Sequence, residues 1–347
     1  MVARPYQFID MACRAYPVGK LPVPVLDFLL RRYTTKTKGL IVGPQIGLDA
    51  TIIKWDKTFL VAKTDPITFT SIELGEYLVR INANDIACMG GQPKYLLVTF
   101  LLPEHGVDKK YVEKLFSQVS RACRSSGISF CGGHTEITGG LSRPIAIGAM
   151  LGEIKDSGRV YLAPAREGDE IILVKGIAIE GTAILAGEKR KVLRKKFGNS
   201  FIKRASLYLK APGISVLKEA EIAWQSGGVK AMHDPTEAGL SGGLYELSLR
   251  LKIGMEIARE AICILPECEE LSSYFGLNPL GLISSGALLV VVAKGKGNKL
   301  VAAYRRKGIL AAIIGQLTKK RKGVWLKDKK GWRPFPYFKR DEIARII

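Results

Sequence analysis

The chain has 347 residues, of which 47% are hydrophobic and 24% are charged, and its formal net charge at pH 7 is +21. This length favours two domains, since a domain usually spans about 100–200 residues. The longest apolar stretch, residues 281–293, is too short for a membrane-spanning helix, which needs ~20 residues.

The first half of the sequence predicts short strands that are separated by two helices. A Pro-punctuated segment ends near Lys38. Apolar residues at helical spacing predict helices over 74–89 and 109–125, and Gly127 ends the second of these. The β-type runs that we expect to form strands are 50–55, 58–64, 95–102, 128–133 and 144–154.

A polar segment with Pro and Gly, residues 156–169, predicts a domain boundary. The continuous apolar run at 287–295 is typical of a strand that is buried on both faces. Further strands are expected at 170–176 and 309–317, and helices near 182–186, 214–225, 237–250 and 299–307. We therefore expect two α+β domains, 1–155 and 166–317, followed by a basic tail over 318–347.

The six cysteines are scattered and include no Cys-x-x-Cys pair, which argues against a zinc site and for reduced thiols. Asp10 lies where a secretory signal would need an apolar run. We therefore expect a cytoplasmic protein without a membrane partner.

The positive charge is densest at 189–196 and at 319–340. Such stretches can bind a polyanion such as nucleic acid, or they can form a solvated surface, with anionic small molecules as the substrates. No recognised RNA- or DNA-binding motif accompanies them. We therefore expect a small-molecule substrate rather than nucleic acid.

Acidic residues at strand ends and helix faces are the first candidates for a ligand site. Asp49 precedes a predicted strand, Asp65 follows one, Asp85 lies near the end of a helix, and Asp234 precedes another helix. Carboxylates at such positions suit Mg²⁺, a hard ion that binds through one or two carboxylates and substrate phosphates. Asn82 lies three residues before Asp85, so one helix face can present both side chains.

Each of these acids also has a purely structural interpretation. Asp49 and Asp65 are suitable turn formers, because Asp hydrogen-bonds its own backbone. Asp234, followed by Pro235 and Thr236, could simply begin the next helix as an N-cap. Only the combination of the acids favours a ligand site. Neither a Walker A nor a Rossmann glycine motif is present in the sequence, so a bound nucleotide would have to be held in another way.

The segment GGHTEITGG, residues 132–140, is the strongest local signal. Gly132 and Gly133 would let the backbone approach a phosphate closely. His134 could pair with a phosphate or relay a proton, because its pKa lies near neutrality. The alternative is a flexible hairpin loop with a surface histidine.

Six segments occur in an order that resembles a known superfamily: DATI, TDPIT, INANDIACMGGQPKYLLVTFLLP, GGHTEITGG, KGIAIEGTAILA and MHDPTEAGLSGGLYEL. The superfamily includes aminoimidazole-ribonucleotide (AIR) synthetase (PurM), HypE, selenophosphate synthetase and thiamine-monophosphate kinase. The resemblance covers approximately residues 35–316. LNPLGLISSGALLVVV is most similar to the HypE-like branch, the AIR synthase related proteins.

The resemblance implies an α+β, two-domain PurM-like fold. Its N-terminal domain would bind ATP and form a β-barrel across a homodimer, and its C-terminal domain would be α/β. The chemistry that it implies is ATP- and Mg²⁺-dependent phosphorylation of an oxygen, often that of a carbonyl or amide, on a small substrate.

Site residues are carried over motif by motif. Asp49, Asp65 and Asp85 match the carboxylates that hold Mg²⁺ and phosphate, and Asp234 matches an acidic residue of the second domain near the nucleotide. Gly132, Gly133 and Thr135 match a nucleotide-contacting loop. We add Asn82 to the cofactor-binding residues, and we expect His134 and Asp234 to act in catalysis.

The sequence also departs from the family pattern. Asp49 is followed by Ala50, where many members have a second acid, and His134 replaces an Asp. HypE ends in Pro-Arg-Ile-Cys, whose cysteine carries the thiocarbamate that is dehydrated to thiocyanate. This chain ends in Ala344-Arg345-Ile346-Ile347 and has no thiol there.

Three hypotheses therefore remain open. The first is a HypE-like enzyme that uses ATP and Mg²⁺ on an unidentified small substrate. The second is a role in hydrogenase maturation with an altered tail. The third is a non-catalytic protein that binds a nucleotide or nucleic acid.

Overall fold

The computed structural model describes residues 16, 19–160 and 162–347. The expectation that rests on Asp10 lies outside these residues. The described residues divide into two compact units, which we call the first unit (38–42 and 49–160) and the second unit (16, 19–37, 43–48 and 162–347). The change from one to the other near Val160 falls inside the polar segment 156–169, whereas the described residues before 38 belong to the second unit.

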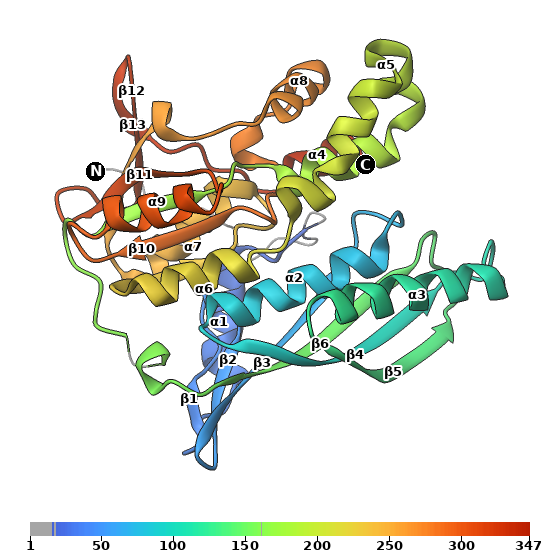
Figure 1. Cartoon of the computed structure of the whole chain (residues 1–347), viewed down its shortest axis with the longest axis horizontal. Coiled ribbons are helices and arrows are strands. Elements are labelled where there is room, and N and C mark those ends of the chain that lie inside the picture. The colour runs from blue at the N-terminus through green and yellow to red at the C-terminus, as the bar shows by residue number, and fades with distance from the viewer. Residues whose placement is uncertain (1–15, 17–18, 161) are drawn as a thin grey trace. The chain divides into compact units, whose positions relative to one another are not determined.

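The first unit is a six-stranded sheet with two helices, α2 (Leu74–Cys88) and α3 (Lys109–Ser125), on one face (Figure 1). All neighbouring strands are antiparallel except β4 and β5. Within the described residues the sheet is open, so the barrel across a homodimer remains a prediction. The strands, in sheet order, are β1 (Leu40–Val42), β2 (Thr51–Trp55), β3 (Thr58–Ile67), β6 (Ile145–Ile154), β4 (Gln92–Leu102) and β5 (Ser129–Ile137).

Two glycines of β6 allow α2 to lie close to the sheet. A Cβ atom at Gly148 would lie only 2.6 Å from Asn82 Nδ2, and one at Gly152 would collide with Ile86. On the other side of α2, the Gly75 N–H donates to Gln118 Oε1 of α3 at 3.1 Å. The close approach places the Asn82 and Asp85 face of α2 directly over β3 and β6.

The second unit is built on a seven-stranded sheet (Figure 1). All neighbouring strands are antiparallel except β12 and β9. The strands, in sheet order, are β13 (Gly331–Pro334), β12 (Val324–Asp328), β9 (Gly254–Ala258), β11 (Ala311–Thr318), β7 (Glu170–Val174), β10 (Leu288–Val292) and β8 (Val229–His233).

Helices α6 (Leu217–Ser226) and α9 (Gly297–Arg306) pack on one face of this sheet, and α7 (Gly239–Leu251) packs on the other. Every residue of β10 is buried, as its unbroken apolar sequence predicts. The remaining helices of the unit are α1 (Val23–Tyr33), α4 (Ile179–Glu188), α5 (Arg190–Leu207) and α8 (Pro266–Phe275).

Residues 318–347 are not a separate tail. They contribute β12 and β13 to the edge of the seven-stranded sheet, and they end in a short 3-10 helix, η5 (Glu342–Arg345). The basic stretch 189–196 lies mostly in α5, where its cations are largely exposed. Across the described chain, no helix combines the length and apolarity that crossing a bilayer requires.

Candidate functional site

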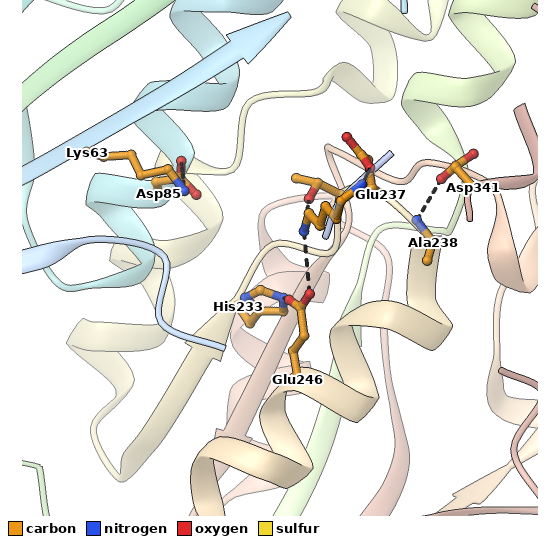
Figure 2. Close-up of polar contacts among 9 residues, drawn as sticks. Lys63, Asp85, His233, Glu237, Ala238, Glu246 and Asp341 are labelled. Atoms are coloured by element: carbon orange, nitrogen blue, oxygen red, sulfur yellow. Dashed lines mark hydrogen bonds and ion pairs between the residues drawn. The ribbon is translucent and has the colours of Figure 1, made fainter. Parts of the chain in front are cut away.

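The first unit gathers carboxylates around the ammonium group of the half-buried Lys63. Lys63 and Asp65 lie two residues apart on β3, so both side chains point to the sheet face that α2 covers. Lys63 Nζ lies 3.2 Å from Asp85 Oδ2 of α2 (Figure 2). Asp49, which precedes β2, is also buried. The first unit therefore brings together the three acids that the sequence assigned to Mg²⁺.

The pKa of Lys63 shows how strongly the acids of this cluster favour a positive charge. Burial disfavours its charged form, but the carboxylates of Asp85, Asp65 and Asp49 outweigh that effect and hold the pKa of Lys63 well above its usual value. The cluster therefore stabilises a cation strongly. Three carboxylates around one ammonium group also form an oxygen-rich environment of the kind that a hard cation prefers.

Asn82 completes this cluster from α2. Its side chain is fully buried, and its Nδ2 donates to the carbonyl oxygens of Leu78 at 2.9 Å and Asp65 at 3.3 Å. Its Oδ1 atom is buried and accepts no hydrogen bond from the described residues. A buried acceptor of this kind requires an explanation, and a hard cation is one that it fits. Oxygen donors from carboxylates and an amide are the donor set that Mg²⁺ prefers.

The segment that contains Gly132, Gly133, His134 and Thr135 is not a loop. It lies in β5, the edge strand of the first unit's sheet, and it is exposed. A Cβ atom at Gly133 would collide with the backbone of Val98, where the register of β4 and β5 shifts. The close approach of two strands therefore explains this glycine without a phosphate.

His134 belongs to an exposed polar chain along β5. Its Nε2 lies 3.0 Å from Glu136 Oε2, and the Thr138 hydroxyl donates to Glu136 Oε1 at 2.8 Å. The Thr138 hydroxyl, followed by His134, lowers the pKa of the Glu136 carboxyl group. These contacts orient His134, and they leave its ring accessible to solvent.

In the second unit, Asp234 directly follows β8 and is 1% exposed. It is not an N-cap: α7 begins only at Gly239, and its N-cap residue is Ala238, which has a positive φ of 60° and makes no side-chain cap. Asp65 likewise lies within β3 rather than after it. The structural interpretations of both acids are therefore wrong, because neither occupies the turn or cap position that they require.

His233, which directly precedes Asp234 in the chain, is buried and lies next to the half-buried Glu246 (Figure 2). His233 Nε2 lies 3.1 Å from Glu246 Oε2, and Lys20 Nζ lies 3.4 Å from Glu246 Oε1. Burial alone would raise the pKa of Glu246, but Lys20 and His233 reverse the shift and lower it to about 2. Glu246 therefore remains ionised at any physiological pH.

Hydrogen bonds link three loops of the second unit, one of which directly follows His233. The Ser284 N–H donates to Thr236 O at 3.2 Å, and the Ala178 N–H donates to Ser284 Oγ at 2.8 Å. The Ser285 N–H donates to Glu180 Oε2 at 3.3 Å. The loops are 234–239, 278–286 and 175–180, and each lies next to the end of a strand.

Several residues of these clusters were missing from the sequence prediction. His233 lies inside MHDPTEAGL, so the motif itself could have identified it. Lys63 lies two residues before Asp65 in a strand pattern, which predicts a shared face. Glu246 and Lys20 carry no local signal, because their contact joins residues that are far apart in the chain.

Comparisons with known proteins agree with this fold. A hydrogenase expression/formation protein, described as putative, from Methanocaldococcus jannaschii is 27% identical over 285 residues, which are 81% of this chain and 81% of that protein. The carbamoyl dehydratase HypE of Rhizobium leguminosarum bv. viciae is 27% identical over 258 residues, 73% of this chain and 70% of that protein. A crystal structure of the hydrogenase maturation protein HypE in complex with ATP superimposes with a TM-score of 0.67 at 22% identity, covering 92% of each chain.

Two family models together match most of the chain. The AIR synthase related protein N-terminal domain matches residues 47–154. The corresponding C-terminal domain matches residues 166–327. The chain therefore belongs to the family of AIR synthase related proteins.

Proposed function

We propose that this protein is an ATP- and Mg²⁺-dependent enzyme, HypE-like in fold, that activates a small substrate by phosphoryl transfer. The observation that carries the proposal is the cluster of three carboxylates around Lys63, together with the buried Oδ1 of Asn82. The ATP complex of a HypE with the same fold supports the choice of nucleotide.

In this proposal Asp49, Asp65 and Asp85 hold Mg²⁺, and Asn82 supplies an amide oxygen. When bound, Mg²⁺ would neutralise charge on the phosphates during transfer. Lys63 offsets part of the negative charge of the cluster while no metal is bound.

The remaining residues are proposed for substrate and nucleotide. Gly132, Gly133 and Thr135 expose the backbone of β5 to a nucleotide, and His134 is the candidate that relays a proton. Asp234 is the candidate acid of the second unit, with His233 as its neighbour.

A homodimer remains part of the proposal. β5 is an edge strand, and its residues 131–137 are exposed. Unpaired strand edges favour pairing with a second chain, and a two-fold axis would let the same edge pair with itself. Light scattering tests this directly, because a mass that stays monomeric at all concentrations contradicts the dimer.

A second candidate is a role in hydrogenase maturation, which the names of the two relatives favour. Residues 338–347, however, contain no cysteine that could carry a carbamoyl group. The large positive charge keeps a nucleic-acid partner as a third candidate. Such binding would weaken steeply with salt, which distinguishes it from binding of Mg–ATP.

Calorimetry with a non-hydrolysable ATP analogue tests the leading proposal. We expect the wild-type protein to bind the analogue more tightly with Mg²⁺ than with EDTA. Asp65→Asn and Asp85→Asn should abolish that difference while the far-UV spectrum stays unchanged. Asp56→Asn is the matched control, because Asp56 is an exposed acid of the same unit at a positive φ that Asn tolerates. Equal Mg²⁺ dependence in all four proteins would contradict the metal assignment.

A further inference from the structure

The carboxylate of Asp341 accepts hydrogen bonds from three backbone N–H groups in the second unit. The Ala238 N–H donates to its Oδ2 atom at 2.7 Å (Figure 2). The Ile283 and Ile343 N–H groups donate to its Oδ1 atom at 3.2 and 2.8 Å. Asp341 is 2% exposed, so these bonds are shielded from water.

These donors belong to different parts of the unit. Ala238 ends the 234–239 loop that begins with Asp234, and it is the residue that precedes α7. Ile283 lies in the 278–286 loop, whose Ser284 and Ser285 contact the other two loops of the site. One side chain therefore joins two of the three site loops to the end of the chain.

The backbone that Asp341 holds is conformationally unusual. Ala238 has a φ of 60° and Gly239 a φ of 58°, which an alanine rarely adopts without support. A Cβ atom at Gly239 would lie 2.5 Å from Leu282 O, so the 234–239 and 278–286 loops are in close contact here. Asp341 binds both loops at this point, and it thereby compensates for the local backbone cost.

Asp341 is itself fixed by the segment around it. The Tyr245 hydroxyl donates to Phe335 O at 2.6 Å, and the Phe338 ring lies against Gly281, where a Cβ atom would collide with it. The Asn278 N–H donates to Glu342 Oε2 at 2.8 Å. A rigid segment can transmit the position of its carboxylate to the loops, whereas a mobile tail could not.

We propose that Asp341 is a positioning residue: it holds the 234–239 loop, and with it Asp234 and His233, in the geometry that the second unit needs to bind a nucleotide. The inference rests on the proposed function for the identity of the ligand. The link between the two loops does not depend on it.

A purely structural role would give a different result, because Asp341 would then stabilise the fold without affecting the ligand. An asparagine at position 341 cannot accept all three of these backbone hydrogen bonds. An amide can accept on one side only, so its NH₂ group would face either Ala238 or the Ile283–Ile343 pair, donor against donor. Asp341→Asn therefore uncouples the two loops and leaves the size of the side chain unchanged.

The charge of Asp341 supplies a second signature. Burial raises its pKa to about 7, and Glu237 adds to the shift, while the three N–H donors oppose it. The facing 234–239 loop carries Asp234 and Glu237, and the 278–286 loop carries no charged side chain. On its own segment, Glu342 is paired with Arg345. Ligand affinity should therefore fall as the pH drops below about 7, when Asp341 takes up a proton.

Three proteins are compared: the wild type, Asp341→Asn and Glu342→Gln. Glu342 is the matched control, since it also joins the final segment to a loop but does not reach Ala238. Amide hydrogen exchange without ligand should be faster at 238–239 and 283–284 in Asp341→Asn alone. The affinity for the Mg²⁺-bound ATP analogue at pH 8 should fall about tenfold in that variant. The further loss of affinity below about pH 7 that we expect of the wild type should be absent from it.

Faster exchange with unchanged affinity and an unchanged pH step would overturn the inference, because Asp341 would then only stabilise the fold. Unchanged exchange would overturn it as well. A wild-type protein that binds no nucleotide would contradict the proposed function, and this inference with it. Binding by the wild type that persists unaltered in Asp341→Asn would contradict the inference alone.

Discussion

Lys63 Nζ and Asp85 Oδ2 lie 3.2 Å apart between β3 and α2, and they form the centre of a cluster in which three carboxylates surround one ammonium group. The ion pair is partly shielded from water, because the Asp85 side chain is 4% exposed and that of Lys63 is 24% exposed. It holds the cluster together in the absence of a metal. It also predicts how the cluster responds when the ammonium group is removed.

Lys63→Met should increase the affinity of the first unit for a divalent cation and lower the stability of the protein without metal. Without the ammonium group, Asp49, Asp65 and Asp85 repel one another, and a divalent cation relieves that repulsion. In EDTA we expect the midpoint of thermal unfolding to fall relative to wild type, and Mn²⁺ to restore most of the loss. Lys54→Met, at an exposed lysine on β2, is the control and should respond to neither reagent. A variant that Mn²⁺ does not stabilise more than wild type would refute the assignment.

Glu246→Gln should remove a pH-dependent part of the stability of the second unit. The pKa of Glu246 is lowered to about 2, from an unfolded value near 4.5, so its contribution is fully present above pH 4.5 and is lost as the pH falls towards 2. This contribution is about 3 kcal/mol at neutral pH, because each tenfold change in proton affinity corresponds to about 1.4 kcal/mol. Urea unfolding from pH 3 to pH 7 measures it.

The control for this series is Glu270→Gln, which changes an exposed carboxylate of α8. The difference in unfolding free energy between wild type and Glu246→Gln should shrink below pH 4.5, whereas that for the control should stay near zero. A difference that is constant with pH would mean that Glu246 contributes by packing and not by charge.

Gly133→Ala tests whether residue 133 is a glycine because of the neighbouring strand or because of a bound phosphate. The added methyl group would collide with the backbone of Val98, so we expect the first unit to lose several kcal/mol of stability. Gly140→Ala is the control: its φ is also positive, at 77°, but its Cβ atom meets nothing within 4 Å, so it should cost about 1 kcal/mol. A stable Gly133→Ala protein that has lost only nucleotide affinity would restore the loop interpretation.

Residues 338–347 should not accept a carbamoyl group. They contain no thiol, and the Ile347 N–H donates to Ile343 O within the segment that Asp341 and Glu342 fix to the second unit. Incubation with ATP, carbamoyl phosphate and HypF, the carbamoyl-transferring partner of HypE, followed by intact mass spectrometry, should show no adduct. A carbamoyl adduct within residues 338–347 would return the protein to hydrogenase maturation.

The sequence predicted well those helices and strands whose buried positions require apolar residues in a clear pattern. The apolar run of β10 has no other stable environment than the middle of a sheet, and α2 combines helical spacing with a buried face. The Lys-rich stretch after residue 318 concealed β12, where only Val324 and Leu326 point inwards. Two buried residues are too few for an alternating pattern to stand out.

The site was predictable only where its residues are neighbours in the chain. Asn82 and Asp85 share a helix face, and Lys63 and Asp65 share a strand face, so spacing alone relates them. Glycine-rich segments are ambiguous, because a phosphate and a neighbouring strand both exclude a Cβ atom, and at Gly133 the neighbouring strand alone is sufficient to do so. Contacts between distant segments, such as that of Asp341 with Ala238, have no local signature.

Anomalous scattering from Mn²⁺ in a crystal grown with the ATP analogue tests the metal assignment most directly. We expect a Mn²⁺ peak within about 2.5 Å of carboxylate oxygens from Asp49, Asp65 or Asp85, with a phosphate oxygen of the nucleotide as a further ligand. Nucleotide density without a metal peak at these carboxylates, or no nucleotide at saturating concentration, would contradict the proposed enzyme.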